Sequence, residues 1–463
     1  MFSKRILKFF KEPNDVYSAI HPLFYMCTFF GLAPYSLVRV ENGKKIFKFA
    51  WWPLIRNALL VLILLGSLTY HAVFDLKPFK DSDLQQKLRY FEEIFSSLLS
   101  CCSVIFGCIF ALKVIEIFKN IEEVDVAFRS LAVWVPYKQM YVSILIHLAT
   151  LVTIVVTLTV NVIFFATFEY GTQVYSFFIM FMTCILPYFI NLLMELQYCH
   201  YLNILRVRYK LLNEYLETLV QETQTLNGKF KKKENISIII NTVVESWTEA
   251  QVKTVASKAK RKSKEIFTSG SKLPKSMLAI SDPVFIVDQV AALHIKLTDT
   301  AHMINYAFCV QQLLRITVTF ISIVTALFLV AINFNKSSSE NKSQLDYFFT
   351  FWAFSNACEV MAIVWITSET CEEANTCPRI LHKIRNNTTN TNLQDTIEIY
   401  SLQMYHNRLY FTVCGLFPLD YTLLYTIVAG VTTYLVILIQ FNNSDFLLKN
   451  STSTEFDNTT ESY

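Results

Sequence analysis

A few polar or amphipathic side chains interrupt the apolar runs of this chain, and they are the residues able to bind something inside a membrane. A polar group in a bilayer is costly, so it usually faces other helices or water. A largely apolar cavity with a few polar groups is the usual composition of a small-ligand site. The residues that we expect to line such a cavity are Asn161, Thr325, Trp352, Ser355, Asn356 and Glu359.

Three charged residues in these runs have simpler alternatives. The carboxylate of Glu359 can pair with a cationic alkaloid, or it can hydrogen-bond to neighbouring Ser and Asn side chains. Arg56 and Arg315 fall near the inner ends of their runs, where a long side chain can extend to the headgroup region. Each polar residue of the set can also serve helix packing alone.

The last apolar run carries a stripe of small and polar residues at helical spacing. Thr426, Gly430, Thr433, Ile437 and Gln440 share one side, and the opposite side is Leu, Val and Ile. If several copies of this helix surround an axis, the stripe lines a pore. Gln440 then forms a ring of amides, and Ile437 forms an apolar constriction that closes by dewetting. Ordinary packing through Thr and Gly explains the same spacing, and periodicity alone favours it.

The familiar catalytic signatures do not occur in the sequence. It contains no HExxH, no GxSxG and no phosphate-binding glycine loop, and only 9 glycines in 463 residues. Cys371 and Cys377 flank a short acidic segment, but no nearby His or Cys completes a tetrahedral metal site. We therefore expect neither an enzyme nor a metal or other cofactor.

The elements that position these residues are long apolar segments. The chain is 53% hydrophobic and only 17% charged, and its apolar residues cluster in runs of about 18 or more, long enough to cross a bilayer. The composition predicts an all-α membrane protein with seven spans. They are residues 52–74, 94–112, 141–165, 175–196, 316–332, 345–367 and 421–441. Another apolar stretch, 21–38, is broken by Gly31 and Pro34, and we expect it in the interface or packed on the bundle.

Basic residues and glycosylation sequons predict the orientation. The segment before the first span is rich in Lys and Arg, which favours a cytosolic N-terminus and, with seven spans, an extracellular C-terminus. Sequons in the segments then placed outside begin at Asn335, Asn341, Asn442, Asn450 and Asn458. Three further sequons, at Asn235, Asn386 and Asn387, fall in loops placed inside and count against this orientation.

The predicted segments follow from this orientation. Residues 1–51 form a cytosolic N-terminal segment, 52–220 the first four spans with a cytosolic extension, and 282–392 the next two spans with theirs. Residues 393–419 form a cytosolic anchor helix and hairpin, 420–442 the pore-lining helix, and 443–463 an extracellular tail. The loop 221–281 is basic and too polar to fold alone, so we expect disorder and binding to anionic membrane lipids, with no nucleic acid as partner.

Three of the expected cytosolic helices carry apolar stripes, and one of them is the approach to the fifth span, 291–314. Leu202, Leu205, Tyr209, Leu212 and Tyr215 recur near helical spacing beyond the fourth span. Ile397, Leu402 and Tyr405 do so within the segment 393–411. A stripe of this kind must be buried, which predicts a helical bundle at the cytosolic face. The alternative is that each helix lies on the lipid surface.

The motif "TYLVILIQF" at 433–441 resembles the signature of insect gustatory receptors, which reads Thr-Tyr, five hydrophobic residues, Gln-Phe. The preceding "CGLFPLDYTLLYTIVAGVT" also resembles this family. The resemblance implies a ligand-gated, cation-permeable channel in the plasma membrane of gustatory neurons. It implies a homo- or hetero-tetramer whose last helices line the pore, so that Gln440 and Phe441 match the gate. It also implies a small-molecule tastant that binds in an outward-opening pocket.

The ligand class is predicted from the same segments. The last span resembles receptors for bitter plant compounds more than the main sugar receptors, and a sugar needs more hydrogen-bonding partners than these spans offer. A fructose-type receptor is the alternative within the family. From other classes, a G-protein-coupled receptor would have an external N-terminus, and a transporter would show internal repeats and broken helices.

Overall fold

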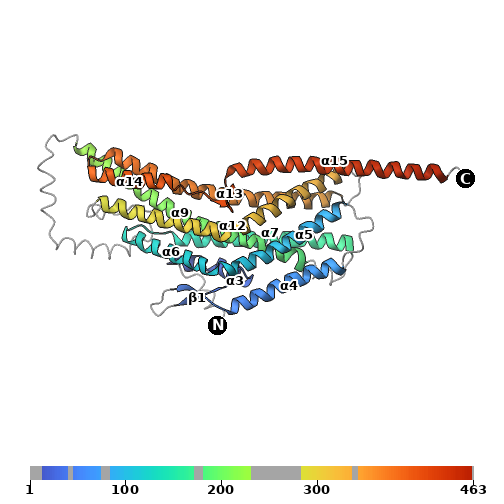
Figure 1. Cartoon of the computed structure of the whole chain (residues 1–463). Coiled ribbons are helices and arrows are strands. Elements are labelled where there is room, and N and C mark those ends of the chain that lie inside the picture. Colours follow the sequence, from blue (N-terminus) through green and yellow to red (C-terminus); the bar gives the residue numbers. More distant parts are fainter. Residues whose placement is uncertain are drawn as a thin grey trace.

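The computed structural model describes residues 13–39, 45–74, 84–170, 181–230, 283–335 and 342–460. Most of them form long helices that run side by side along one axis (Figure 1). The helices are α2 (Val16–Ala19), α3 (His21–Phe29), α4 (Trp52–Phe74), α5 (Leu84–Ile109), α6 (Ala111–Ser130), α7 (Tyr137–Tyr170), α9 (Leu186–Phe230), α12 (Pro283–Asn335), α13 (Lys342–Asn387), α14 (Thr391–His406) and α15 (Tyr421–Thr460). One π-helical turn, η1 (Phe181–Ile185), precedes α9.

Two short antiparallel hairpins accompany the helices. β1 (Tyr35–Arg39) pairs with β2 (Lys45–Phe49), and β3 (Thr412–Val413) pairs with β4 (Phe417–Pro418). The second hairpin joins α14 to α15, and Gly415 in its turn has a φ of +73°, a conformation that glycine adopts without strain. The chain therefore reverses sharply just before its last helix.

Six described helices hold a segment long and apolar enough to cross a membrane: α4, α5, α7, α12, α13 and α15. They correspond to six of the seven predicted spans, although the second, 94–112, was predicted to run three residues beyond the end of α5 at Ile109. The fourth predicted span, 175–196, begins outside the described residues, and its described part forms η1 and the first turns of α9. The fold is helical, as the sequence predicts.

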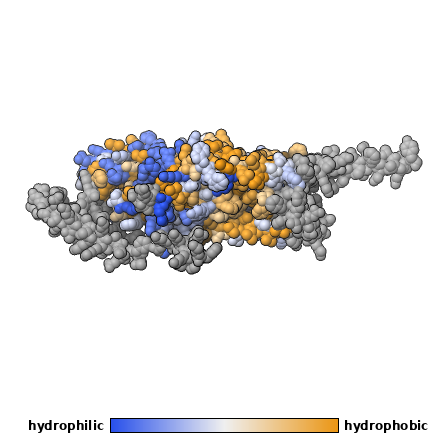
Figure 2. Space-filling model, turned by 90° about the horizontal axis from the view of Figure 1, so that it is seen from below, coloured by the Kyte–Doolittle hydropathy of each residue, from blue (hydrophilic) through white to orange (hydrophobic). Residues whose placement is uncertain are grey.

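The three longest described helices, α12, α13 and α9, far exceed the thickness of a membrane. α12 has 53 residues, and at 1.5 Å per residue it spans about 80 Å, against about 30 Å for the hydrocarbon core of a bilayer. α9 and α13 have 45 and 46 residues and pack beside it. The excess lies at the end of the bundle that holds α14, which we call the anchor end. Hydrophilic residues gather there, and hydrophobic ones cover the adjoining part of the surface (Figure 2).

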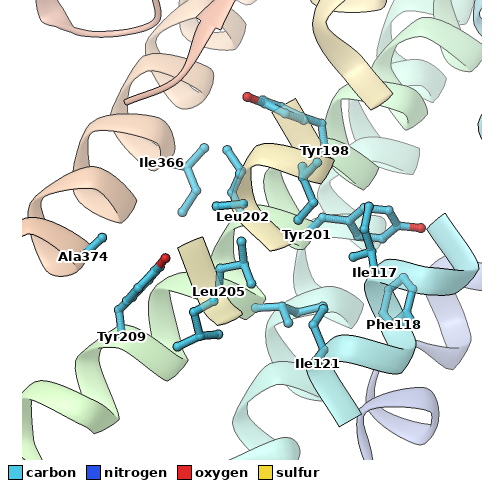
Figure 3. Packing of buried hydrophobic residues seen from close by; sticks show 14 of the residues in the cluster. Ile117, Phe118, Ile121, Tyr198, Tyr201, Leu202, Leu205, Tyr209, Ile366 and Ala374 are labelled. Carbon is cyan, nitrogen blue, oxygen red and sulfur yellow. The ribbon is translucent and has the colours of Figure 1, made fainter. Parts of the chain in front are cut away.

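The core at the anchor end includes the predicted stripe of α9. Leu202, Leu205, Tyr209 and Leu212 are fully buried, which confirms that the stripe packs inside a bundle. Figure 3 shows this stripe beside residues of α6 and α13. The phenol of Tyr209 lies 3.1 Å from the Thr298 hydroxyl, and burial raises the pKa of Tyr209 well above its ordinary value, so this pair is neutral.

The predicted stripe of α14 is wrong. Ile397 is fully buried, whereas Leu402 and Tyr405 are each 57% exposed. The buried face instead uses Leu393, Ile397, Ser401 and Met404, at spacings of four and three residues. Leu402 and Tyr405 were grouped with Ile397 by residue type, but the 3.6-residue period places them on another side. α14 thus has a second apolar face that its own chain does not cover.

The N-terminal segment folds onto the bundle, one of the two positions predicted for residues 21–38. Leu23 and Cys27 on α3 are buried, and the Tyr35 hydroxyl lies 3.0 Å from that of Tyr201 on α9. The sequence did not predict the strands that follow α3. Two further predicted segments differ as well, since α9 continues to Phe230 and α15 to Thr460, while 231–282 lie outside the described residues.

A buried ion pair ties α6 to α9 at the anchor end. The Arg208 guanidinium donates to both carboxylate oxygens of Asp125, at 2.8 and 2.6 Å, and also to the Ile204 carbonyl. The Tyr137 hydroxyl donates to the same carboxylate at 2.7 Å. The side chains of Arg208 and Asp125 are 0% and 2% exposed, so each depends on the other for its counter-charge.

Candidate functional site

The last helix, α15, lies along one edge of the bundle (Figure 1). Only 11% of its span Tyr421–Asn442 is buried within the chain, the smallest share among the six spans. Its buried side is apolar and includes Leu423 and Val431. The remaining surface must therefore be covered by lipid, by water or by other protein chains.

The predicted stripe of α15 turns away from the rest of the chain. Thr426, Thr433, Ile437 and Gln440 are exposed, and so is Phe441. The hydroxyls of Thr426 and Thr433 donate to carbonyls of their own helix, at 3.1 and 2.9 Å. The Gln440 amide lies on the same exposed side. Thr426, Thr433 and Gln440 are therefore not packed against the rest of the described chain.

Gly430 stands at the edge of this stripe and contacts α12. A Cβ atom at Gly430 would lie 3.0 Å from the Phe320 ring, closer than side chains normally approach. The same ring packs edge-on against Tyr434, with centroids 5.9 Å apart. The glycine therefore allows α12 and α15 to approach closely, and Phe320 is the point of contact between them.

A second set of residues joins four helices in the part of the bundle away from the anchor end. We call the polar cluster the set formed by Glu92, Tyr188, Glu195, Gln312, Arg315, Ser322, Trp352, Ser355 and Glu359. The residues come from α5, α9, α12 and α13, which pack against one another. Three of the predicted ligand residues, Trp352, Ser355 and Glu359, belong to it.

Trp352 is the aromatic centre of the polar cluster. Its indole N–H donates to Glu92 Oε1 at 2.8 Å, and Ser322 donates to the same oxygen. Its ring lies 4.6 Å from that of Tyr188, centroid to centroid. The Tyr188 hydroxyl in turn lies 3.3 Å from Ser355 Oγ. An aromatic pair and a carboxylate thus meet between four helices.

Arg315 is the cation of the polar cluster, and it is the partner of Glu359 in the chain, in place of the neighbouring Ser and Asn side chains. The pairing of Glu359 with a cationic alkaloid stays a prediction. Arg315 donates through two nitrogens to the two carboxylate oxygens of Glu359. Its Nε lies 4.0 Å from Glu195 Oε1, and its side chain is 2% exposed. The prediction that Arg315 extends to the headgroup region is therefore wrong, because two buried carboxylates hold it inside the bundle.

The other predicted ligand residues stand apart from these contacts. Asn356 is buried and donates to the Trp352 carbonyl of its own helix at 2.9 Å, so that its amide N–H is satisfied locally. Thr325 is buried on α12, one turn beyond Ser322. Asn161 belongs to α7, but its side chain lies outside the described part of the structure.

One glycosylation candidate ends a helix, and three others lie within α15. Asn335 is the last residue of α12, and Asn442 lies in α15 directly after Phe441. Asn450 and Asn458 also lie in α15, which was predicted to have ended before them, and their side chains are outside the described residues. Asn341 is outside the described residues altogether.

Sequence reasoning missed Glu92, Tyr188 and Glu195. Glu92 comes two residues before the predicted second span, and Glu195 comes one residue before the predicted end of the fourth. Each was assigned to a boundary rather than to the interior. A signal was present for α9, since Tyr188, Asn191 and Glu195 follow one another at helical spacing.

Comparison with known proteins identifies the family to which the chain is similar. The chain matches the family model described as 7tm Chemosensory receptor over residues 20–444. It is 25% identical over 464 residues to gustatory receptor 28a of Drosophila melanogaster, with 96% of each chain covered. It is also 29% identical over 171 residues to gustatory receptor 28b of the same species, which covers 36% of each chain.

A solved structure has the same fold. The insect olfactory receptor OR5 from Machilis hrabei superimposes with a TM-score of 0.57, covering 91% of this chain and 97% of that one at 10% identity. The helical membrane fold, the exposed last helix with its TYLVILIQF motif, and the match over most of the chain agree with one another. This chain belongs to the 7tm chemosensory receptor family, with insect gustatory receptors among its relatives.

Proposed function

We propose that this chain is a ligand-gated cation channel in the plasma membrane of gustatory neurons, opened by bitter plant compounds. It works as a homo- or hetero-tetramer whose four α15 helices surround the pore. The N-terminus and the anchor end face the cytosol, and the C-terminus faces outward. The ligand binds at the polar cluster, in the outer half of the bundle.

One observation carries the channel assignment. α15 is the most exposed span, and the side that it turns away from its own chain bears Thr426, Thr433 and Gln440. Amide and hydroxyl groups that face lipid are unfavourable, so such a side is expected to face protein or water. Copies of α15 arranged around a water-filled axis satisfy this requirement, and the second apolar face of α14 offers a contact between the copies.

The ligand assignment is supported by the composition of the polar cluster. Aromatic rings with a few polar groups are typical of small-molecule sites, and several helices contribute to this one. The anchor end is filled with large buried side chains and is joined by the Asp125–Arg208 pair, which suits a rigid base rather than a binding site.

The channel proposal is tested with the full chain expressed alone in a cell line. We expect currents carried by cations when alkaloids and other bitter compounds are applied, and none from cells that lack the chain. A response to fructose without a response to bitter compounds would contradict the proposed ligand class and support the channel assignment. A tag on residue 1 that is stained without permeabilising the cells would contradict the orientation, and would favour a G-protein-coupled receptor.

The site is tested with Trp352→Ala once an activating compound is found. We expect its dose–response curve to shift while surface expression is retained. Phe354→Ala is the matched control, because Phe354 is an aromatic residue of the same helix that is 65% exposed. An unchanged dose–response curve for Trp352→Ala would contradict ligand binding at the polar cluster.

A further inference from the structure

We infer that the polar cluster selects ligands that carry a protonated amine on an aromatic body, with Glu92 as the counter-charge. This inference rests on the proposed function for its site, but it concerns the charge of the ligand rather than the existence of a channel. It follows from three features of the polar cluster: its charges, its unsatisfied oxygens and its rings.

The carboxylates of the polar cluster outnumber its cations. Glu92, Glu195 and Glu359 are accompanied by one guanidinium, that of Arg315. Glu359 takes two of the Arg315 hydrogen bonds, and Glu195 lies 4.0 Å from Nε. Among the described residues, the hydrogen bonds that Glu92 accepts come from neutral donors, Trp352 and Ser322. Because a charge within the membrane needs a partner, the polar cluster favours an additional cation.

Unsatisfied oxygen atoms lie in the same part of the bundle. Glu195 Oε1, Asn191 Oδ1 and Gln312 Oε1 are buried, and none of them accepts a hydrogen bond from the described residues. Asn191 is one turn before Glu195 on α9, and the Gln312 amide donates to the other Glu195 oxygen at 3.2 Å. All three atoms are acceptors, so a group rich in N–H donors matches them better than a group with lone pairs.

The aromatic rings complete the recognition of an amine. Tyr188 and Trp352 lie 4.6 Å apart, and Phe348 stacks on Trp352 with centroids 6.2 Å apart and planes 24° from parallel. The faces of such rings attract cations and also cover an aromatic skeleton. The hydrogen bonds that Glu92 accepts come from Trp352 and Ser322, whereas Arg315 donates to Glu359, so an amine that pairs with Glu92 leaves the ion pair of Arg315 and Glu359 in place.

The chemistry separates this ligand class from its competitors. A carboxylate or phosphate ligand would bring a further anion to a cluster that already holds three carboxyl groups and one guanidinium. A neutral polyol brings hydroxyl donors but no charge, and it leaves Glu92 with neutral partners only. An arylalkylammonium ion supplies the charge, the donors and the ring together.

The test uses the full chain, purified in detergent and followed by its thermal stability. The probes are phenethylammonium, tryptammonium and a three-ring arylalkylammonium ion, each beside the neutral alcohol of the same skeleton. We expect at least one ammonium ion to bind about tenfold more tightly than its alcohol, the scale of one charge-assisted contact. Equal affinities within every pair, or no stabilisation by any ammonium ion, would overturn the inference.

Variants assign the preference to Glu92. In Glu92→Gln the ammonium ion and its alcohol are expected to bind equally, whereas Glu92→Asp retains the preference because it retains the charge. Glu398→Gln is the matched control, since Glu398 pairs with Arg385 on the surface of α14. A Glu92→Gln protein that still prefers the ammonium ion would contradict the role of Glu92. If Glu92→Gln does not fold, the role is tested with Glu92→Asp. A folded Glu92→Asp protein that has lost the preference would contradict it. If only neutral ligands evoke currents, the inference that the chain selects amines is contradicted, whereas the proposed channel function is not.

Discussion

Removal of Arg315 is expected to destabilise the chain far more than removal of its main partner. Arg315→Met leaves two buried carboxylates, those of Glu359 and Glu195, without their cation. Breaking a buried ion pair by removing one partner costs about 3–5 kcal/mol. Glu359→Gln removes one carboxylate but leaves Arg315 with Glu195, so we expect a loss of about 1–3 kcal/mol, the scale of an impaired buried hydrogen bond.

These energies correspond to large changes in the folding equilibrium. A loss of about 3–5 kcal/mol changes the ratio of folded to unfolded chain by roughly two to almost four powers of ten. The Arg206–Glu369 pair is the comparison, because its side chains are 24% and 32% exposed. Exposed pairs contribute about 0–1 kcal/mol, so Arg206→Met is expected to have a small effect.

The measurement is heat-induced loss of the monodisperse chain, followed by size-exclusion chromatography with fluorescence detection. The expected order of melting temperatures places Arg315→Met lowest, Glu359→Gln between, and Arg206→Met nearest to the unaltered chain. If Arg315→Met melts with Arg206→Met, the guanidinium is not buried between the carboxylates. If Glu359→Gln melts with Arg315→Met, Glu195 does not act as a second partner.

Three further predictions test the packing. Asp125→Asn removes the counter-charge of a buried guanidinium and is expected to cost about 3–5 kcal/mol, read as a lowered melting temperature; an unaltered one would mean that the pair is solvated. Gly107→Ala places a Cβ atom 2.9 Å from the backbone carbonyl of Leu32 and is expected to destabilise the chain by about 1–3 kcal/mol. Gly66→Ala is the control, because its Cβ atom meets nothing within 4 Å and the chain should keep its melting temperature. Equal melting temperatures for the two variants would refute the close approach of Gly107 to Leu32. Gly430→Ala should push α15 away from Phe320 and alter the current without ligand, and Phe320→Leu should reverse this change; if it does not, the two residues are not in contact.

The spans could be predicted because lipid imposes length and composition on a helix. A run of about 20 apolar residues has few other uses, and the described helices correspond to six of the predicted runs. The strand β1 was not predicted, because its residues continue an apolar segment and pair with a strand beyond it. Such pairing depends on contacts that a local pattern does not contain.

Sequence periodicity succeeded for α9 and failed for α14 for a physical reason. Tyr209 and its neighbours on α9 repeat at the spacing of a single buried face. α14 has apolar residues on two faces, and only the one around Ile397 contacts the rest of the chain. A sequence shows which residues are apolar, but it does not show which face the chain itself covers.

The polar cluster was predicted in part. Trp352 and Glu359 lie within an apolar run, where a polar group is costly and therefore indicates a candidate site. Glu92 and Glu195 stand near the ends of their runs, where a charged residue is ordinary. Their burial depends on how α5 and α9 pack against α12, and that arrangement is not local in the sequence. Arg315 was misplaced for the same reason.

The central claim is that α15 lines a cation pore, with Gln440 facing its axis. Gln440→Ala removes an amide that can bond to its neighbours around the axis and widens the mouth. We expect more current without ligand and an altered discrimination among cations. Gln440→Glu places negative charge at the mouth and should favour divalent cations. Ile437→Val should be tolerated, whereas Ile437→Ser should leak, since a polar constriction wets more readily.

The most direct measurement is the reversal potential of the current through Gln440→Glu and Gln440→Ala channels, taken with surface labelling of the same cells. The reversal potential does not depend on how many channels reach the surface, so it separates a pore residue from one that serves folding or packing. The account predicts a shift toward the divalent cation potential for Gln440→Glu and a different shift for Gln440→Ala. Reversal potentials equal to those of the unaltered chain, with surface expression reduced, would contradict the account and place Gln440 between helices.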